Sequence, residues 1–365
     1  MASNAEQGGP HRLEIELTPV CDHRCVHCYN VWNAEPGDPQ HGLAPKVQGD
    51  LERARALIDR VAEQGIEHLS LTGGEPLLHP RALEIIEHAC TRVPSVGLIT
   101  NGSHVSEAVA RRLGAAGLKT AQLTLLGGRR EVHDALKDVE SFDDTLRSVL
   151  RLRDAGVRVN ACYVSSQRNA GQLPAVLELC FAMGIRSLSY NRMSAAGLGV
   201  HRIAALLPSP EQLEADLLAC ETLARRWQIR VSTAMPVPPC IVHTARYPWV
   251  RFGFCSSGSG QHNLVMDLEG QVRACNLSHR VLGSALEEPL SALADDGYLA
   301  EFRSSLPLMC RGCPHARSCG GGCKESAFAA FGSLDAPDPL VWLALSPEER
   351  ARLELPDLPE QEACP

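Results

Sequence analysis

The sequence predicts an α/β fold in which a partial barrel precedes a small cysteine-rich domain. From about residue 12 to residue 233, short β-branched or apolar runs alternate with longer segments of helical period, the pattern of βα units around a parallel sheet. After about residue 234 the composition shifts to Pro, Gly and Cys, with only short regular segments. Six βα units are too few for a closed eight-stranded barrel, so we expect an open, TIM-like (β/α)6 barrel with its functional residues at the C-terminal ends of the strands.

The barrel elements are predicted in chain order from residue type and period. The strands are expected at residues 13–17, 66–72, 95–100, 120–126, 157–164 and 185–191. The helices are expected at residues 51–62 and near 80–91, 105–116, 141–154, 171–183 and 211–227. The first helix is the clearest, because Leu51, Leu57 and Ile58 fall on one face and Gly65 follows as a C-terminal cap.

The cysteine-rich part has one clear regular feature, a hairpin over residues 262–275 that turns at Glu269 and Gly270. Its apolar content is thin, so we expect a bound metal to supply part of its folding free energy. A short helix and a Pro- and Glu-rich tail end the chain. The expected divisions are a tail (1–11), the barrel (12–233), the cysteine-rich domain (234–341) and a second tail (342–365).

Composition narrows the classes of function. Lys and Arg number 35 against 43 Asp and Glu, a formal net charge of −8, so no nucleic-acid partner is expected. No run of about 18 uncharged apolar residues and no signal-peptide pattern occurs, so neither membrane insertion nor export is expected and the predicted location is the cytoplasm. Lysine is scarce and no GxxxxGK stretch exists, which excludes a P-loop. In a reducing compartment, 15 cysteines favour metal or redox use over disulfides.

The first cysteine cluster follows the first predicted strand. Cys21, Cys25 and Cys28 form a C-x3-C-x2-C pattern in the loop where a barrel keeps its active site. Three thiolates so close in sequence can hold three irons of a [4Fe–4S] cluster and leave the fourth iron open to a small chelating molecule. The alternative is a structural zinc site completed by a nearby histidine.

This loop, CDHRCVHC, resembles the signature of the radical S-adenosylmethionine (SAM) superfamily. His27 stands at the position that is aromatic in the family, and Tyr29 follows the last cysteine. The resemblance implies a glycine-rich turn after the second strand, where paired glycines let backbone carbonyls approach the SAM amino group. That turn is present as Gly73, Gly74, Glu75 and Pro76.

The resemblance also implies SAM contacts at three further strand ends. Asn101 ends the third strand, and Thr124 keeps a hydroxyl that could reach the ribose, although Leu126 replaces the acid common in relatives. Arg192 ends the sixth strand and could pair with a carboxylate of SAM or of the substrate; an arginine at the surface or at a helix start is the alternative. Cys162 lies within the fifth strand, where core packing is the favoured role; the alternative is that alternation turns it inward as a hydrogen-atom donor.

The late cysteines resemble the SPASM extension that many radical SAM enzymes carry. Their spacings are C-x14-G-x4-C and, further on, C-x2-C-x5-C-x3-C. The resemblance implies two auxiliary iron–sulfur clusters, cluster I on Cys255, Cys275 and Cys323, and cluster II on Cys310, Cys313 and Cys319. A zinc ribbon built from the last four cysteines is the alternative and would leave the first two unused.

The fourth ligand of each auxiliary cluster is left open. Val341 stands where relatives have a final cysteine. The candidates for cluster II are Cys364, Asp335, Asp338 or no protein ligand, and those for cluster I are Cys240, Glu325 or an open iron. A fully ligated cluster would act as an electron relay, whereas an open iron would bind substrate.

The resemblance implies an activity. A reduced [4Fe–4S] cluster cleaves SAM, and the resulting 5′-deoxyadenosyl radical abstracts a hydrogen atom from the substrate. The auxiliary clusters then accept the substrate electron or only anchor their domain, and a flavodoxin- or ferredoxin-type protein supplies the reducing electron.

The substrate expected from this resemblance is a ribosomally synthesised peptide that is crosslinked, oxidised or otherwise matured. Only about a dozen residues precede the first strand, so a separate recognition protein is expected to present the peptide. One alternative is a small-molecule epimerase or dehydrogenase that acts on a sugar, an aminoglycoside or a tetrapyrrole side chain. Another is a non-catalytic iron–sulfur or zinc redox sensor.

Overall fold

The computed structural model of the chain describes residues 10–33, 49–259 and 263–358. One sheet runs through it, in the order β11-β10-β9-β1-β2-β3-β4-β5-β6-β7-β8. Its first six strands are parallel neighbours in chain order: β1 (Arg12–Glu16), β2 (His68–Thr72), β3 (Ser95–Thr100), β4 (Thr120–Thr124), β5 (Arg158–Ser165) and β6 (Ser187–Arg192). All six predicted strands are confirmed, with ends that differ by at most two residues.

Five more strands extend the sheet at its two ends. Beyond β6 lie the short parallel strands β7 (Arg230–Ser232) and β8 (Val250–Arg251). Beyond β1 lies β9 (Asn263–Asp267), which is parallel to β1 and antiparallel to β10 (Gln271–Arg273), and β11 (Val281–Ser284) closes the edge. The predicted hairpin is therefore confirmed as β9–β10. The hairpin continues the barrel sheet. The expected domain boundary near residue 234 therefore stays a prediction.

The predicted barrel helices are also present. They are α1 (Leu51–Glu63), α2 (Ala82–Arg92), α3 (Glu107–Ala115), α5 (Phe142–Asp154), α6 (Leu173–Ala182) and α8 (Pro210–Ala219), and a π-helical turn (Cys220–Ala224) continues α8. Polar caps explain several starts: Asp50 accepts the Arg53 amide at 2.7 Å, and Ser106 accepts that of Val109. Two helices had no predicted counterpart, α4 (Arg130–Lys137) and α7 (Ile203–Leu206).

Short helices make up most of the C-terminal part. They are α9 (Ser256–Ser259), α10 (Leu290–Ala294), α11 (Gly297–Ser304), α12 (Ala316–Cys319), α13 (Lys324–Phe331), α14 (Pro339–Ala344) and α15 (Pro347–Arg352). Single 3-10 turns lie at Val31–Asn33, Pro76–Leu78, Gln167–Asn169, Gly197–Arg202, Thr244–Arg246 and Leu308–Cys310. No helix in the described ranges combines the length and the apolar character that a membrane crossing requires.

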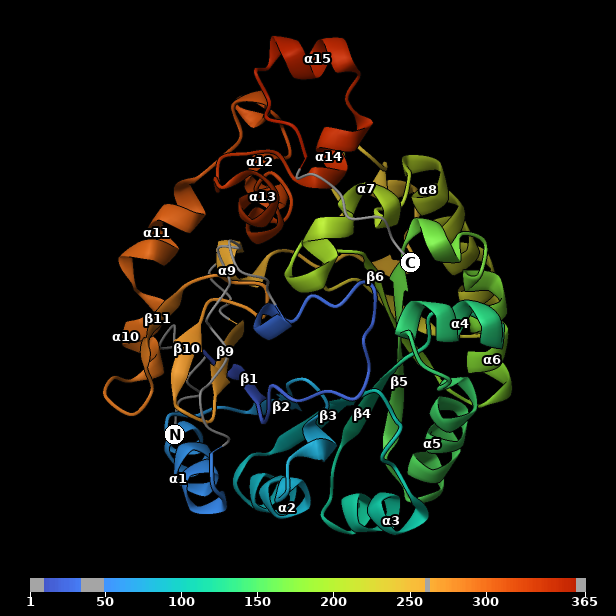
Figure 1. Cartoon of the computed structure of the whole chain (residues 1–365), viewed down its shortest axis with the longest axis vertical. Coiled ribbons are helices and arrows are strands. Elements are labelled where there is room, and N and C mark those ends of the chain that lie inside the picture. Colours follow the sequence, from blue (N-terminus) through green and yellow to red (C-terminus); the bar gives the residue numbers. More distant parts are fainter. Residues whose placement is uncertain (1–9, 34–48, 260–262, 359–365) are drawn as a thin grey trace.

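The two faces of the curved sheet differ in chemistry, because alternate strand residues point to opposite sides. The outer face carries buried apolar side chains such as Ile15, Leu71 and Leu123, which pack under the helices that surround the sheet (Figure 1). The inner face is polar: Asn160 donates from Nδ2 to Gln122 Oε1 at 2.8 Å and to Ser189 Oγ at 2.9 Å. The barrel interior is thus suited to a polar ligand.

Candidate active site

The loop that carries the first three cysteines is fixed by backbone pairing to the turn after β2. The Gly74 amide donates to Thr18 O at 2.7 Å, and the Glu75 amide donates to Val20 O at 2.8 Å. A Cβ on Gly74 would lie 2.3 Å from Val20 O, and one on Gly73, where φ is +137°, would lie 2.5 Å from Thr18 O. The approach of the cysteine loop's own backbone is therefore what requires both glycines.

The Glu75 carboxylate joins this turn to the end of β3. It is fully buried and accepts hydrogen bonds from Thr100 Oγ1 at 2.8 Å and from the Asn101 amide at 2.7 Å. Asn101 in turn donates from Nδ2 to Asp22 Oδ1 at 2.9 Å, next to Cys21. Pro76 begins a buried 3-10 turn. Glu75 and Asn101, both predicted as site residues, thus position the cysteine loop.

The three thiols themselves form a neighbouring set. None of the three is in a disulfide, and all are partly exposed. Burial raises the pKa of Cys21 and of Cys25 to about 11, and the charge of Cys25 on Cys21, like that of Cys28 on Cys25, adds to the rise. Iron binding would have to displace these protons. Within the described residues no three Cys, His, Asp or Glu side chains converge on a single metal ion, but a cluster of four irons spreads its thiolates over a wider frame.

Neutral histidines and one buried cation lie beside these thiols. The Val26 amide donates to Leu136 O at 3.1 Å and so joins the cysteine loop to the end of α4, where Lys137 is 2% exposed. Burial first, and then the Lys137 charge, lower the pKa of His27 to about 4. The Nδ1 atoms of His23 and His27 are enclosed and have no hydrogen-bond partner among the described residues. Three thiols and unpaired enclosed nitrogens fit an iron–sulfur cluster with a ligand beside it.

His133 has a structural position behind this group. Its Nδ1 accepts the Leu126 amide at 3.3 Å, and its ring meets Phe142 edge-on with 5.5 Å between centroids. Burial lowers its pKa to about 2, with Lys137 as the next cause. His133 therefore stays neutral and ties α4 to the end of β4.

Cys162 faces the barrel interior, as alternation along the strand predicted. It lies opposite Thr124 of β4 in the sheet, and Asn191 approaches its Sγ from β6 with Nδ2 at 3.6 Å. Burial raises the pKa of Cys162 to about 11, which keeps the thiol protonated at neutral pH. Burial raises the pKa of Tyr29, and the charges of Glu14, Cys162 and Cys28 add to the rise. Thr124 itself is partly exposed at the end of β4.

Sequence reasoning missed two inward glutamates on β1. Glu16 forms a buried ion pair with Arg273 of β10. Glu14 accepts hydrogen bonds from Asn263 Nδ2 at 2.8 Å and from Asn276 Nδ2 at 3.1 Å. Burial raises the pKa of both carboxyl groups. The signal was present, because alternation in LEIEL places both glutamates on the face opposite Leu13 and Ile15.

Arg192 is engaged in contacts within the protein, and its expected role as a contact of SAM or of the substrate stays a prediction. Its side chain is fully buried and forms an ion pair with Asp338, while Nε donates to Pro236 O at 2.9 Å and Nη1 to Met193 O at 3.4 Å. The same Asp338 carboxylate accepts the Cys323 amide at 2.7 Å. Arg192 therefore fastens the C-terminal segment to the end of β6.

The late cysteines fall into two neighbourhoods. The first neighbourhood contains Cys255, Cys275 and Cys323, because the charges of Cys255 and Cys323 help to raise the pKa of Cys275. The second is defined by Cys310, whose pKa is raised to about 11 by burial and then by the charges of three further thiolates, those of Cys240, Cys319 and Cys313. Thiols from each predicted set thus act on one another, and the two auxiliary clusters stay a prediction. Cys364 lies outside the described residues.

Glu325, one predicted candidate for cluster I, is already engaged. It is 1% exposed, accepts the Tyr298 hydroxyl at 2.8 Å on Oε1, and lies 2.9 Å from His279 Nδ1 with Oε2. The nearby Cys275 thiol is affected by its charge. Glu325 thus organises the side chains beside the first neighbourhood.

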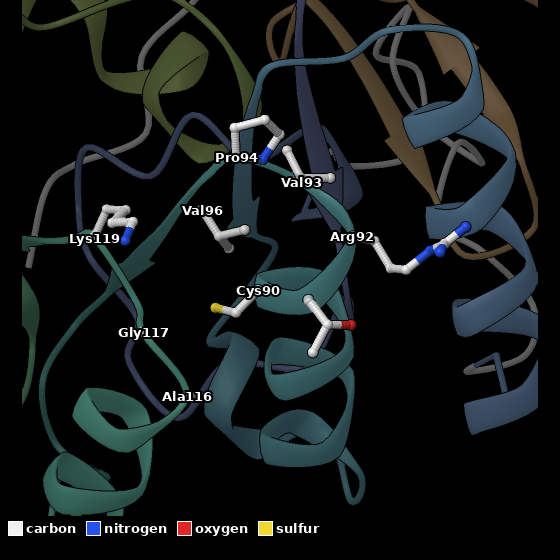
Figure 2. A pocket seen from close by; sticks show the side chains of 9 residues that line it. Cys90, Arg92, Val93, Pro94, Val96, Ala116, Gly117 and Lys119 are labelled. Atoms are coloured by element: carbon white, nitrogen blue, oxygen red, sulfur yellow. The ribbon is translucent and has the colours of Figure 1, made fainter.

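A hollow of about 470 Å³ lies away from all these groups. Figure 2 shows it between the end of α2 and the residues that precede β3 and β4, with Cys90, Pro94 and Lys119 on its wall. These are the N-terminal ends of the strands, opposite the cysteine loop. The hollow therefore does not contribute to the site.

Comparison with known proteins agrees with this geometry. Residues 15–179 match the sequence model of the radical SAM superfamily. The chain is 28% identical over 345 residues to PqqA peptide cyclase of Xanthomonas campestris pv. campestris, covering 91% of this chain and 86% of the relative. It is 27% identical over 341 residues to mycofactocin maturase MftC of Mycobacterium tuberculosis, covering 90% and 82%.

Solved structures share the fold. SuiB of Streptococcus suis bound to S-adenosylmethionine superposes with a TM-score of 0.69 at 15% identity, over 91% of this chain and 76% of SuiB. The enzyme anSMEcpe with bound AdoMet and a peptide gives 0.68 at 17% identity, over 91% and 94%. Radical SAM proteins bind a [4Fe–4S] cluster and SAM, the groups that the cysteine loop fits. Over residues 15–179 the chain is thus similar to the radical SAM superfamily, and over about nine-tenths of its length it is similar to the two relatives above.

Proposed function

We propose that the protein matures a ribosomally synthesised peptide by radical chemistry, forming a crosslink or another oxidised product. One observation carries the proposal: the similarity to PqqA peptide cyclase and to mycofactocin maturase MftC extends over about nine-tenths of the chain. The polar barrel interior supports it, because a peptide carries hydrogen-bonding groups along its whole length.

The SAM site of this proposal is the cysteine loop. Cys21, Cys25 and Cys28 would hold the [4Fe–4S] cluster, which with SAM supplies a 5′-deoxyadenosyl radical that removes one hydrogen atom from the substrate. Glu75 and Asn101 hold the loop in register with the strand ends. The neutral His27 and the Gly73–Gly74 turn border the space beside the thiols.

The inner wall of the barrel would meet the peptide. Glu14 and the buried pair of Glu16 with Arg273 offer polar atoms for its backbone and side chains.

We further propose that the late cysteines hold auxiliary iron–sulfur clusters. Cys255, Cys275 and Cys323 would hold cluster I, and the group around Cys310 would hold cluster II. These clusters would supply a path for the electron that a substrate radical must lose when it closes a crosslink. A flavodoxin- or ferredoxin-type protein would supply the electron for SAM cleavage, and a reducing cytoplasm would suit the 15 cysteines.

The test is co-expression under anaerobic conditions with each short open reading frame that flanks the gene. Mass spectrometry should find one peptide that has lost two hydrogen atoms per crosslink, and 5′-deoxyadenosine should accumulate with it. The Cys28→Ala variant, purified in parallel, should give unmodified peptide. If SAM is cleaved but no flanking peptide changes mass, peptide maturation is excluded for those substrates; if SAM is never cleaved, the proposed radical catalysis fails.

A second candidate is a small-molecule epimerase, favoured by the inward position of Cys162. A protonated thiol against the barrel wall can return a hydrogen atom to a substrate radical, which an epimerase requires and a crosslinking maturase does not. Under this alternative, Cys162→Ala would keep SAM cleavage and lose turnover. Under peptide crosslinking, the same variant would keep both.

A further inference from the structure

The second cysteine neighbourhood has three thiols in the expected spacing and a valine where a fourth ligand was expected. Val341 is 5% exposed and lies in α14 between the buried side chains of Leu340 and Trp342. Its amide donates to Asp338 O at 2.8 Å, as a residue in the first turn of a helix does. An aliphatic side chain packed in this way offers no ligand atom, so a cluster here must be completed from another segment.

The two nearby carboxylates are already used. Asp338 is fully buried, and its Oδ2 accepts the Cys323 amide and pairs with Arg192, while its Oδ1 caps α14 through the Leu340 amide at 2.9 Å. Removing it from these partners would leave Arg192 as an unpaired buried charge. Asp335 is exposed and accepts the Leu306 amide at 2.7 Å with Oδ1. Neither carboxylate is poised to bind iron.

Cys240 enters the same neighbourhood from the barrel side. It lies four residues after Pro236, whose carbonyl oxygen accepts the Arg192 Nε hydrogen at 2.9 Å. Because Arg192 also binds Asp338, one buried guanidinium joins the loop after β7 to the segment that carries Cys323. The loop that bears Cys240 is thus fixed beside the cysteine-rich segment.

The mutual influence of the thiols agrees with this geometry. Burial is the main cause that raises the pKa of Cys240 and of Cys310; after it, the charges of Cys319 and Cys313 act on Cys240, and the charge of Cys240 acts on Cys310. Such effects fade within a few ångströms to about ten. The four sulfurs therefore share one corner of the molecule, and Cys240 is exposed there, not packed as a core residue.

We propose that Cys240 is the fourth thiolate of auxiliary cluster II, together with Cys310, Cys313 and Cys319. The assignment rests on the auxiliary clusters of the proposed function, and it moves Cys240 from cluster I, where the sequence had suggested it, to cluster II. The cluster so formed has no open iron, which suits electron transfer and not substrate binding. It also ties the loop after β7 to the C-terminal helices.

The test uses the Cys21→Ala/Cys25→Ala/Cys28→Ala protein, purified anaerobically, so that only auxiliary clusters contribute. Iron and sulfide should reach roughly eight per chain, at four per cubane. Adding Cys240→Ala should remove one iron, with the EPR signal of a three-iron cluster, or lower the count toward roughly four. Adding Cys90→Ala, which changes a cysteine outside both neighbourhoods, should leave count and spectrum unchanged. An unchanged count and spectrum in Cys240→Ala would overturn the proposal.

Two further measurements cover the case in which the alanine variant fails to fold. Cys240→Ser should keep four irons in cluster II with an altered EPR spectrum, because a serine oxygen replaces the sulfur; an unaltered spectrum contradicts the assignment. In the full chain, iodoacetamide should alkylate the exposed Cys240 only after iron is removed, and equal labelling with and without iron would contradict it. Peptide modification is not measured in any arm, so failure of the assignment is separate from failure of the maturase proposal.

Discussion

The two cysteine regions are built in opposite ways. The first takes its three thiols from eight residues of a single loop, and backbone hydrogen bonds from Gly74 and Glu75 hold that loop. The second draws on segments from Cys240 to Cys323, which buried side-chain contacts bring together, above all the pair of Arg192 and Asp338. A local motif needs only a turn to support it, whereas a dispersed one needs long-range contacts between charged side chains.

The same contrast appears in how each region handles charge. Around the first, His27 and His133 are kept neutral by burial and by the nearby charge of the buried Lys137. Around the second, each buried charge has a partner. Arg192 forms an ion pair with Asp338, and the Lys324 ammonium donates hydrogen bonds to the carbonyl oxygens of Phe302 and Ser305. The first region should therefore respond to backbone changes and to acid, and the second to the loss of one partner of a pair.

The largest expected effect distinguishes the two cysteine regions by the reaction step that each supports, SAM cleavage or formation of the finished product. Cys28→Ala should lower the formation of 5′-deoxyadenosine to the level of a sample without enzyme, because the cluster loses one of its three ligands. Cys319→Ala should keep SAM cleavage and lose only the finished product. High-performance liquid chromatography of 5′-deoxyadenosine and mass spectrometry of the product measure the two. Equal loss of SAM cleavage in both variants would contradict the division of roles.

The next effect probes the side-chain contacts of the second region. Arg192→Leu leaves the buried Asp338 carboxylate without its charge partner, which should lower the free energy of unfolding by about 3–5 kcal/mol. The control Arg112→Leu breaks an exposed pair with Glu87 and should leave stability unchanged within error. Urea titration measures both. If Arg192→Leu behaved like the control, the pair would not hold this region together.

A smaller effect probes the backbone contacts of the first region. Gly74→Ala places a Cβ 2.3 Å from Val20 O, and displacing the cysteine loop should cost about 1–3 kcal/mol. Gly297→Ala is the matched control, since its Cβ would meet no atom within 4 Å and the change should be neutral or stabilising by about 0.4–1 kcal/mol. Thermal unfolding compares the variants. Equal unfolding midpoints for the Gly74→Ala and Gly297→Ala proteins would show that the turn after β2 tolerates a side chain at position 74.

The sequence was sufficient where one segment contains the whole signal. Strand alternation located β1 to β6 and the inward side of Cys162, and the spacing of three cysteines located the loop that Gly73 and Gly74 support. The glycines were predicted for a ligand's approach, yet the structure shows them meeting the loop's own backbone. The motif predicted glycine at both positions. The physical reason for glycine there, the close contact with the backbone of the cysteine loop, could be seen only in the structure.

The sequence was insufficient where distant segments meet. Nothing in the residues around Arg192 indicates that its partner is Asp338, some 146 positions later, and the sequence predicted a ligand contact for it. Likewise, β9 reads as half of a local hairpin, and its parallel pairing with β1 appears only in the fold. Cys240 shows the same limit, since its sequence neighbours carry no motif that links it to Cys310.

The smallest effect tests the neutral histidines of the first region through pH. The folded pKa of His133 is lowered to about 2 by burial, whereas an unfolded histidine titrates near 6.5. Between these values the unfolded chain binds one more proton, so stability is lost as pH falls below about 6.5, by at most about 1.4 kcal/mol per pH unit.

His133→Gln removes this dependence and should make the profile between about pH 5 and 7.5 shallower. The control is His243→Gln, which replaces a histidine whose ring is exposed. Urea unfolding at each pH gives the slopes, and parallel profiles for all three proteins would mean that His133 is protonated without cost and that burial does not keep this region neutral.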